Sequence, residues 1–271
     1  MIFASDLDQT LIYSENFIAR HYRSAVKIKS EQLKIIEYYQ GKPLSYIHPG
    51  VIKLLQEFNS QHHFVPVTTR TEEQYRRIQF ADWNINPRYA ITTNGAKVLI
   101  DGKPDLKWQH RINKLVQQSS PSIADIKVLL KDFFSKDQVL KIREAEDVFI
   151  YCVLDMSQTS LAQINDLRKC FSKDDWRLSL QGRKLYFMPH FISKGDAIKY
   201  VCECLGESRY IAAGDSLLDL PLLVNAQKAY IPGHGEIFEQ GLHREYDVII
   251  CKNEGVTASV QILEGLKSMF S

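Results

Sequence analysis

The most informative segment of the chain is Phe3-Ala4-Ser5-Asp6-Leu7-Asp8-Gln9-Thr10-Leu11. Its first residues continue an apolar run that begins at Ile2, and this run predicts a buried strand over residues 2–5. Asp6 and Asp8 follow the strand at once, so both carboxylates can face one point in space, where their like charges repel. A divalent cation between them, or separate duties in one reaction, would offset that repulsion.

Two plainer interpretations of the pair are a solvated turn and the start of a calcium-binding loop. Such a loop needs an oxygen ligand at its fifth position, glycine next and glutamate at its twelfth. Counted from Asp6, these positions hold Thr10, Leu11 and Phe17, so only the first fits. The solvated turn remains the alternative for the pair alone, and the rest of the chain decides between them.

Composition sets broad limits on the protein. A length of 271 residues with 45% hydrophobic residues allows one large domain or two modest ones with a packed core. The formal net charge of +2 gives no electrostatic footprint for nucleic acid or membrane. The N-terminus lacks a basic region followed by a long apolar stretch, so we expect neither signal peptide nor membrane span. The cysteines are Cys152, Cys170, Cys202, Cys204 and Cys251. Their spacing fits neither a zinc site nor a disulfide framework, so we expect free thiols in a reducing cytoplasm.

Strand-like and helix-like patterns alternate along most of the chain, which predicts an α/β fold with a mainly parallel sheet. The expected strands are 2–5, 63–67, 89–92, 210–213, 230–231 and 248–251. The expected helices are 30–40, one opened by His48-Pro49-Gly50, 72–82, 194–205, 217–224 and 256–270.

The pattern changes in the middle of the chain. Hairpins are predicted over 97–108 and 176–188, paired strands over 139–143 and 148–154, and helices over 121–134 and 161–171. We therefore predict a discontinuous core domain, residues 1–95 and 187–271, interrupted by an α+β module at 96–186.

Polar side chains suited to phosphate or metal gather where apolar strands end or helices begin. They are Asp6 with Asp8, Thr68-Thr69-Arg70, Lys194 at a helix start, and Gly214-Asp215-Ser216-Leu217-Leu218-Asp219. Because the carboxyl ends of parallel strands converge on one crevice, these distant segments can meet.

Chemically the set suffices for phosphoryl transfer through an enzyme carboxylate. One aspartate can attack phosphorus, and a second can protonate the leaving alcohol. Further carboxylates can hold Mg²⁺, while a hydroxyl and a lysine neutralise the phosphoryl oxygens. A glycine-rich P-loop is missing from the sequence, which disfavours an ATP-dependent enzyme of that type.

At these motifs the chain resembles the haloacid dehalogenase (HAD) superfamily, through D-x-D-x-T at 6–10 and G-D-x-x-x-D at 214–219. The long insertion, with Thr92-Thr93-Asn94-Gly95-Ala96 at its entrance, is similar to the Cof-like and sucrose-phosphatase-like branch. The resemblance implies a Rossmann-like core with an inserted α+β cap of the C2 type. It also implies a Mg²⁺-dependent phosphomonoester hydrolase of a small phosphorylated metabolite, with sugar phosphates as the leading class.

The resemblance assigns roles residue by residue. Asp6 would be the nucleophile and Asp8 the general acid and base, while Thr68 and Lys194 would bind the phosphoryl group. The implied metal ligands are Asp6, the backbone carbonyl of Asp8, Asp215 and Asp219. An acid at position 8 favours phosphatases and phosphomutases, because their leaving group needs a proton.

Some positions depart from the family pattern. Gln9 and Thr69 stand where the family usually has glycine, and Leu218 stands where this branch usually has asparagine. The candidate substrate contacts are Thr69, Arg70 and Asn94, the last also at the expected hinge of the inserted module.

Residues 13–48 are long for the stretch between the first motif and the first core helix. They carry Arg20, His21, Arg23, Lys27 and Lys29. This stretch is either a solvated helical face or a flap that adds cations over an anionic substrate.

Two alternative functions remain open at this point. A phosphomutase could use the same core and move phosphate within a sugar. A regulatory or binding module could keep the fold without turnover.

Overall fold

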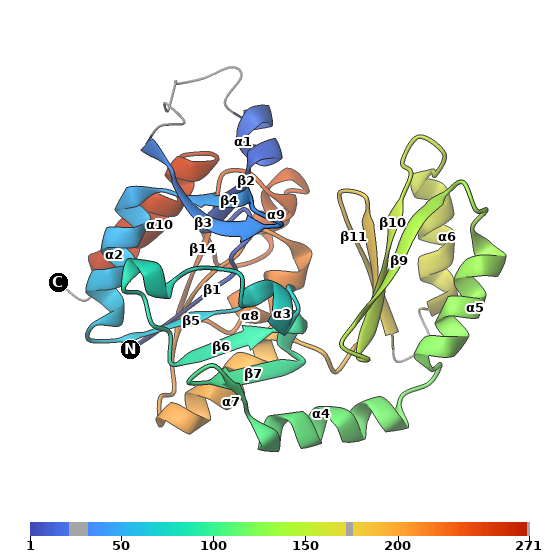
Figure 1. Cartoon of the computed structure of the whole chain (residues 1–271), viewed down its shortest axis with the longest axis horizontal. Helices are drawn as coiled ribbons and strands as arrows, with labels where there is room; N and C mark the ends of the chain where they lie inside the picture. Colours follow the sequence, from blue (N-terminus) through green and yellow to red (C-terminus); the bar gives the residue numbers. More distant parts are fainter. Residues whose placement is uncertain (22–31, 172–175, 270–271) are drawn as a thin grey trace. The chain divides into compact units, whose positions relative to one another are not determined.

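The computed structural model of the chain describes residues 1–21, 32–171 and 176–269. It divides into two compact units, shown in Figure 1. The core unit comprises Met1–Asp105 and Lys194–Ser271, and the inserted unit comprises Leu106–Ser193. The sequence-based division, 1–95 and 187–271 around 96–186, puts both junctions earlier along the chain. The fold is an α/β core with a parallel sheet that is interrupted by an α+β insertion.

A parallel sheet forms the centre of the core unit, with strand order β15-β14-β13-β1-β5. The strands are β1 (Ile2–Ser5), β5 (His63–Pro66), β13 (Ile211–Ala213), β14 (Lys228–Ile231) and β15 (Ile249–Ile250), which confirms the predicted strand pattern. β1 pairs in parallel with both β13 and β5. Its residues are buried throughout, as expected for a parallel strand covered on both faces.

Helices lie on both faces of this sheet. α2 (Pro49–Asn59) and α10 (Val256–Lys267) pack with Phe3 in one hydrophobic core. Side chains alternate along a strand, so Ala4 faces the other side. There α8 (Leu220–Leu223) packs against β13 and β14, and α7 (Lys194–Leu205) packs against α8.

A second, antiparallel sheet lies between the first motif and α2, where the sequence pattern predicted a helix over 30–40. Its order is β2-β4-β3, with β2 (Ile12–Ser14), β3 (Lys34–Tyr39) and β4 (Lys42–Ile47). The helix prediction is wrong for the described residues. Gln40 and Gly41 both have positive φ, 52° and 74°, and this two-residue turn joins β3 to β4 as a hairpin.

Residues 22–31 lie outside the described part of the chain. The predicted cationic residues Arg23, Lys27 and Lys29 therefore cannot be placed. Arg20 is exposed near the end of α1 (Glu15–His21).

A third small sheet extends the core beyond β5. It consists of β6 (Tyr89–Thr92), β7 (Lys97–Ile100) and β8 (Lys103–Pro104). A parallel bridge between Val67 and Ile91 joins it to the end of β5. The predicted strand over 105–108 is wrong, because α4 (Leu106–Gln118) begins there and buries Trp108 and Ile112. Pro104 ends β8, since proline lacks the N–H that a longer ladder needs.

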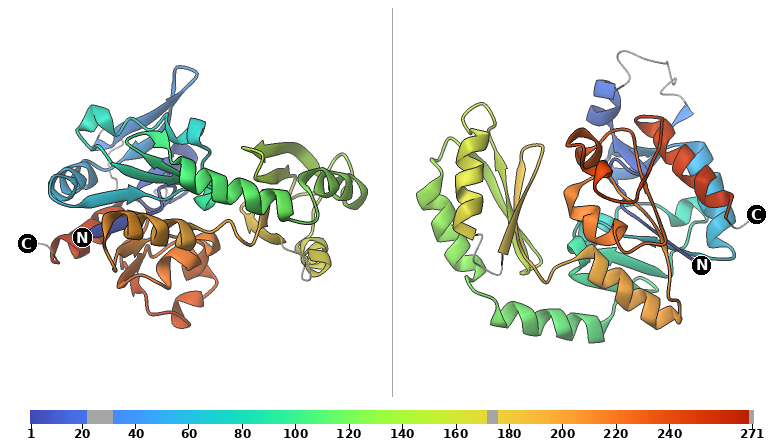
Figure 2. Two further views of the ribbon diagram at one scale, coloured as in Figure 1. Left: turned by 90° about the horizontal axis from the view of Figure 1, so that it is seen from below. Right: turned by 180° about the vertical axis from the view of Figure 1, so that it is seen from behind.

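The inserted unit is an antiparallel sheet of order β11-β12-β10-β9 with helices beside it (Figure 2). Its strands are β9 (Val139–Ala145), β10 (Phe149–Leu154), β11 (Trp176–Gln181) and β12 (Lys184–Pro189). The other helices are α5 (Ile123–Phe133) and α6 (Leu161–Phe171), the latter packing Phe171 against Phe187. These strands and helices confirm the predicted elements of this region.

The remaining helices are short. The predicted helix over 72–82 is only partly right: α3 (Glu72–Tyr75) stops early, and a 3₁₀ turn follows at Ala81–Trp83. Further short elements are α9 (Glu236–Glu239) and 3₁₀ turns at Thr93–Gly95, Leu217–Asp219 and Leu242–Arg244. Among the described residues, the helices are all too short or too polar to cross a membrane.

Candidate active site

Three of the predicted site segments meet at the carboxyl edge of the parallel sheet. Asp6 directly follows β1, Asp215 follows β13, and Thr68 follows β5. The Asp6 N–H donates to the carbonyl of Ala213 at 2.9 Å, which joins the first and fourth motifs. Asp6, Asp215 and Thr68 are all buried.

Lys194 lies among these carboxylates although it is the first residue of α7. Its Nζ donates to Asp6 Oδ1 at 2.6 Å and to Asp219 Oδ1 at 2.5 Å. The side chain is 1% exposed. Burial opposes its charge, but Asp219 and Asp6 raise the pKa of Lys194 above its usual range. Lys194 is therefore a fixed cation between two motifs.

Negative charge still exceeds positive charge in this cluster. Oxygens of Asp6, Asp215 and Asp219 lie within 4.8 Å of one another. Burial, opposed by Lys194 and reinforced by Asp219 and Asp8, raises the pKa of Asp6 from 3.8 to about 7. Burial and then repulsion by Asp6 and Asp219 raise the pKa of Asp215 well above its usual range. Three buried carboxylate groups beside the single ammonium group of Lys194 leave an excess of negative charge, which fits a hard divalent cation such as Mg²⁺.

Asp219 shapes the fourth motif as well as holding Lys194. Its Oδ2 accepts bonds from the Asp215 N–H (3.2 Å), the Ser216 N–H (2.9 Å) and the Ser216 hydroxyl (2.8 Å). A Cβ added at Gly214 would lie 2.5 Å from the Asp219 Cβ, so this close approach requires glycine. Leu218, the departure within this motif, is buried at 2% exposure.

Thr10 completes the first motif by facing two of the carboxylates. Its hydroxyl lies 3.4 Å from Asp6 Oδ2 and 3.5 Å from Asp215 Oδ1. Both separations are at the outer limit for a hydrogen bond, so Thr10 links the groups loosely.

Asp8 has a different partner from Asp6. Arg70 donates to it twice, from Nε to Oδ2 at 2.7 Å and from Nη2 to Oδ1 at 2.8 Å. Arg70 also donates to Glu37 Oε2 at 2.8 Å. The structure thus places Arg70, a predicted substrate contact, in a bidentate pair with Asp8.

Gln9 has a left-handed backbone, with φ of 65°, which explains why glycine is usual at this position. Its carbonyl lies 2.8 Å from Nε2 of the buried His234. The Gly255 N–H donates to His234 Nδ1 at 2.9 Å, so Nε2 carries the proton and donates to Gln9. Sequence reasoning missed His234; the one available signal was its place between two glycines, Gly233 and Gly235.

Thr68 and Asn94 lie side by side at the end of β5. The Asn94 N–H donates to the Thr68 carbonyl at 2.9 Å. The Thr68 hydroxyl oxygen accepts from the Arg70 N–H at 3.1 Å, so the Thr68 O–H points away from that N–H and can donate to another group. Asn94 is fully buried in a left-handed conformation, and its side-chain amide has no hydrogen-bond partner in the described part of the chain. Thr69, the third candidate here, is half-buried.

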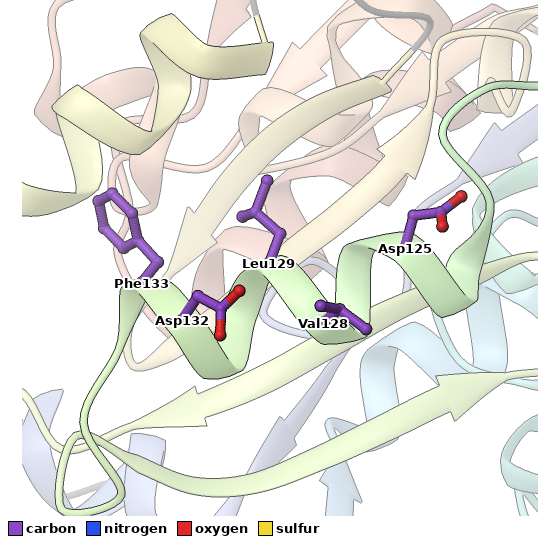
Figure 3. A pocket seen from close by; sticks show the side chains of 5 residues that line it. All are labelled: Asp125, Val128, Leu129, Asp132 and Phe133. Atoms are coloured by element: carbon purple, nitrogen blue, oxygen red, sulfur yellow. The ribbon is translucent and has the colours of Figure 1, made fainter.

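A hollow on the inserted unit lies away from all of these residues in sequence. It is formed on α5 and lined by Asp125, Val128, Leu129, Asp132 and Phe133, as Figure 3 shows. It contains none of the predicted site residues.

Comparison with known proteins gives a family match over most of the chain. Residues 50–266 match the model of the family described as sucrose-6F-phosphate phosphohydrolase. A search of curated proteins found no match.

Solved structures share the fold at low sequence identity. The sucrose-phosphatase from Synechocystis sp. PCC6803, solved with sucrose and phosphate, has a TM-score of 0.68 at 17% identity, covering 100% of this chain and 98% of that one. A Thermoplasma acidophilum protein has a TM-score of 0.65 at 12% identity, covering 98% and 97%. The haloacid dehalogenase-like hydrolase yhjK from Bacillus subtilis has a TM-score of 0.54 at 15% identity, covering 98% and 91%.

Proposed function

The chain belongs to the sucrose-6F-phosphate phosphohydrolase family, and from this premise we propose that it hydrolyses the phosphate ester of a sugar with Mg²⁺ bound. As a phosphatase of the HAD type, it is a phosphoric monoester hydrolase. The observation that carries the proposal is Lys194, which bonds both Asp6 and Asp219 within one buried cluster. The sucrose complex of the Synechocystis relative supports a sugar phosphate as substrate class.

Asp6 is the proposed nucleophile. One of its oxygens attacks phosphorus, forming an O–P bond as the bond from phosphorus to the sugar oxygen breaks. Asp8 gives its proton to that departing oxygen. Asp8 then takes a proton from water as the water oxygen attacks the aspartyl phosphate, which releases phosphate and restores Asp6.

The proposed metal ligands are Asp6, Asp215, Asp219 and the backbone carbonyl of Asp8. The first three offer oxygens close together in a buried site where three carboxylates face the single ammonium group of Lys194, which supports this assignment. When bound, Mg²⁺ would supply the charge that offsets the phosphoryl oxygens.

Thr68 and Lys194 are the proposed ligands of the phosphoryl oxygens. The hydroxyl of Thr68 can donate, because its lone pair already accepts from the Arg70 N–H. The unpartnered, buried amide of Asn94 supports a substrate contact there, and Thr69 is proposed as a neighbouring contact. We propose that the module at 96–186, taken as a cap domain, selects the leaving group.

Release of inorganic phosphate from a panel of sugar phosphates that includes sucrose 6F-phosphate tests this function. We expect release with Mg²⁺, loss of release with EDTA, and loss in Asp6→Asn. The matched control is Asp137→Asn, an exposed aspartate between α5 and β9, which should keep full activity. An Asp6→Asn variant with full activity would end the proposal, and isomerised sugar without free phosphate would indicate a mutase instead.

A further inference from the structure

We propose that Glu37, acting through Arg70, is a positioning residue that holds the Asp8 carboxylate for proton transfer to the leaving group. We call Asp8, Arg70 and Glu37 the Asp8 relay. The inference rests on the proposed function, because it assigns a purpose to contacts of the proposed general acid.

Arg70 binds the Asp8 carboxylate through two hydrogen bonds from its planar guanidinium group. Nε and Nη2 each donate to a different oxygen of the carboxylate, at 2.7 and 2.8 Å. Paired bonds of this kind fix the plane of the carboxylate as well as its place. A carboxylate has about four lone-pair sites, and the bonds from Arg70 take up two of them.

The Asp8 side chain depends on these bonds for a fixed orientation, because it is 45% exposed, whereas the Arg70 side chain is 12% exposed. A half-exposed aspartate can rotate away from a reacting atom. An arginine anchored in the protein interior restricts that rotation, which is the pre-organisation that catalysis requires.

Glu37 anchors Arg70 from the antiparallel sheet. Its side chain is fully buried, and its Oε2 accepts from Arg70 Nη1 at 2.8 Å. Ser45, its direct partner across β3 and β4, donates to the same oxygen at 2.7 Å. Arg77 donates to Oε1 at 3.1 Å. Both Glu37 oxygens are thereby held, so Arg70 meets a rigid acceptor.

The electrostatics agree with a charged, fixed guanidinium. Burial disfavours the charged form of Arg70, but the carboxylates of Asp8 and Glu37 outweigh burial and raise the pKa of Arg70 above its usual range. Four of the five guanidinium N–H groups donate within the protein, two to Asp8, one to Glu37 and one to Ser45. Arg70 therefore bonds carboxylates of the protein itself. Through Glu37, the β3–β4 hairpin helps to hold the Asp8 carboxylate in place.

A leaving-group comparison tests the relay. A general acid matters more for phenyl phosphate, whose departing oxygen is more basic, than for 4-nitrophenyl phosphate. We measure kcat/KM for both esters with Mg²⁺ and take their ratio, in which the fraction of folded enzyme cancels. Removing the general acid should cost 10²–10⁴-fold where protonation is needed.

We expect Glu37→Gln to lower kcat/KM for phenyl phosphate about tenfold more than for 4-nitrophenyl phosphate. Ser45→Ala, a milder change, should shift the ratio in the same direction by less. In an Asp8→Asn background, Glu37→Gln should leave the ratio unchanged, since residues acting as one unit are not additive. Glu57→Gln, which removes a surface ion pair with Lys267, is the matched control and should change neither ester.

The outcomes separate the relay from the proposed function. Equal losses on both esters in Glu37→Gln would overturn the relay and leave the phosphatase intact. A further change of the ratio in the Asp8→Asn background would also overturn it. A wild-type protein that hydrolyses neither these esters nor any sugar phosphate of the panel would instead overturn the proposed function.

Discussion

Replacing Asp6 with asparagine should make the metal-free protein more stable at neutral pH. Burial raises the pKa of Asp6 from 3.8 to about 7, so the folded state holds this proton more tightly than the unfolded chain does. Between about pH 4 and pH 7 the folded state therefore binds more protons, and its free energy of unfolding falls as pH rises. Below about pH 4, Asp6 does not lower the free energy of unfolding, because it is protonated in both states. Above about pH 7, the full loss of free energy of unfolding is present.

The size of the effect follows from the size of the shift. A change of about 3 pKa units corresponds to roughly 4 kcal/mol. For a chain of this length, that is on the order of 10 °C in melting temperature. Asp215 should add an effect of the same sign, because its pKa is also raised by burial and by its acidic neighbours.

Thermal unfolding from pH 4.5 to 8 in EDTA measures this dependence, with the wild type, Asp6→Asn and the control Asp137→Asn, at an exposed position, side by side. We expect the wild type and the control to lose stability steeply toward pH 7, and Asp6→Asn to lose much less. Mg²⁺ should restore the wild type at neutral pH, because a bound cation favours the ionised carboxylates. Parallel pH curves for the wild type and Asp6→Asn would refute the reasoning.

Three further substitutions test other contacts. Lys194→Met removes the ammonium group that bonds Asp6 and Asp219, and we expect phosphate release to fall at least about 10³-fold in a steady-state assay; near-normal release would contradict its role. Gln9→Gly relieves a left-handed φ of 65° and should raise the free energy of unfolding by about 1 kcal/mol in urea, whereas a loss would show that the side chain stabilises the loop. Gly235→Ala adds a Cβ 2.8 Å from that of Asp215 at a φ of 93°, so it should cost more than Gly241→Ala, which has a φ of 73° and nothing within 4 Å; equal urea midpoints would exclude the clash.

The meeting of the four motifs could be predicted because it depends on one general property of the fold. Carboxyl ends of parallel strands share an edge, so a strand pattern followed by Asp6, Thr68 or Asp215 is enough to place these residues near each other. Lys194 could be placed only through its order in the family motifs, because a lysine at a helix start has no distinguishing local pattern.

Glu37 and His234 could not be predicted, for two different physical reasons. Glu37 lies in a strand whose apolar spacing resembles a helix, so its inward direction depends on the Gln40-Gly41 turn and on pairing with Ser45. His234 acts through a hydrogen bond to a backbone carbonyl 225 residues away, and such a contact leaves no periodic signal. Both are buried polar groups whose partners are distant in sequence, and tertiary structure alone brings those partners together.

The two aspartates of the first motif differ because the charges around them differ. Asp6 shares its surroundings with Asp215 and Asp219 but bonds a single cation, Lys194, so negative charge is in excess there. Asp8 and Glu37 contact Arg70 and Arg77, so charges balance in the contacts described on that side. A divalent cation is therefore favoured beside the Asp6 carboxylate, where it offsets repulsion, and gains little from the Asp8 carboxylate, which Arg70 already neutralises. The buried Leu7 separates the two aspartates, so one short loop holds two carboxylates in opposite electrostatic surroundings, as the proposed roles of metal-binding nucleophile and proton donor require.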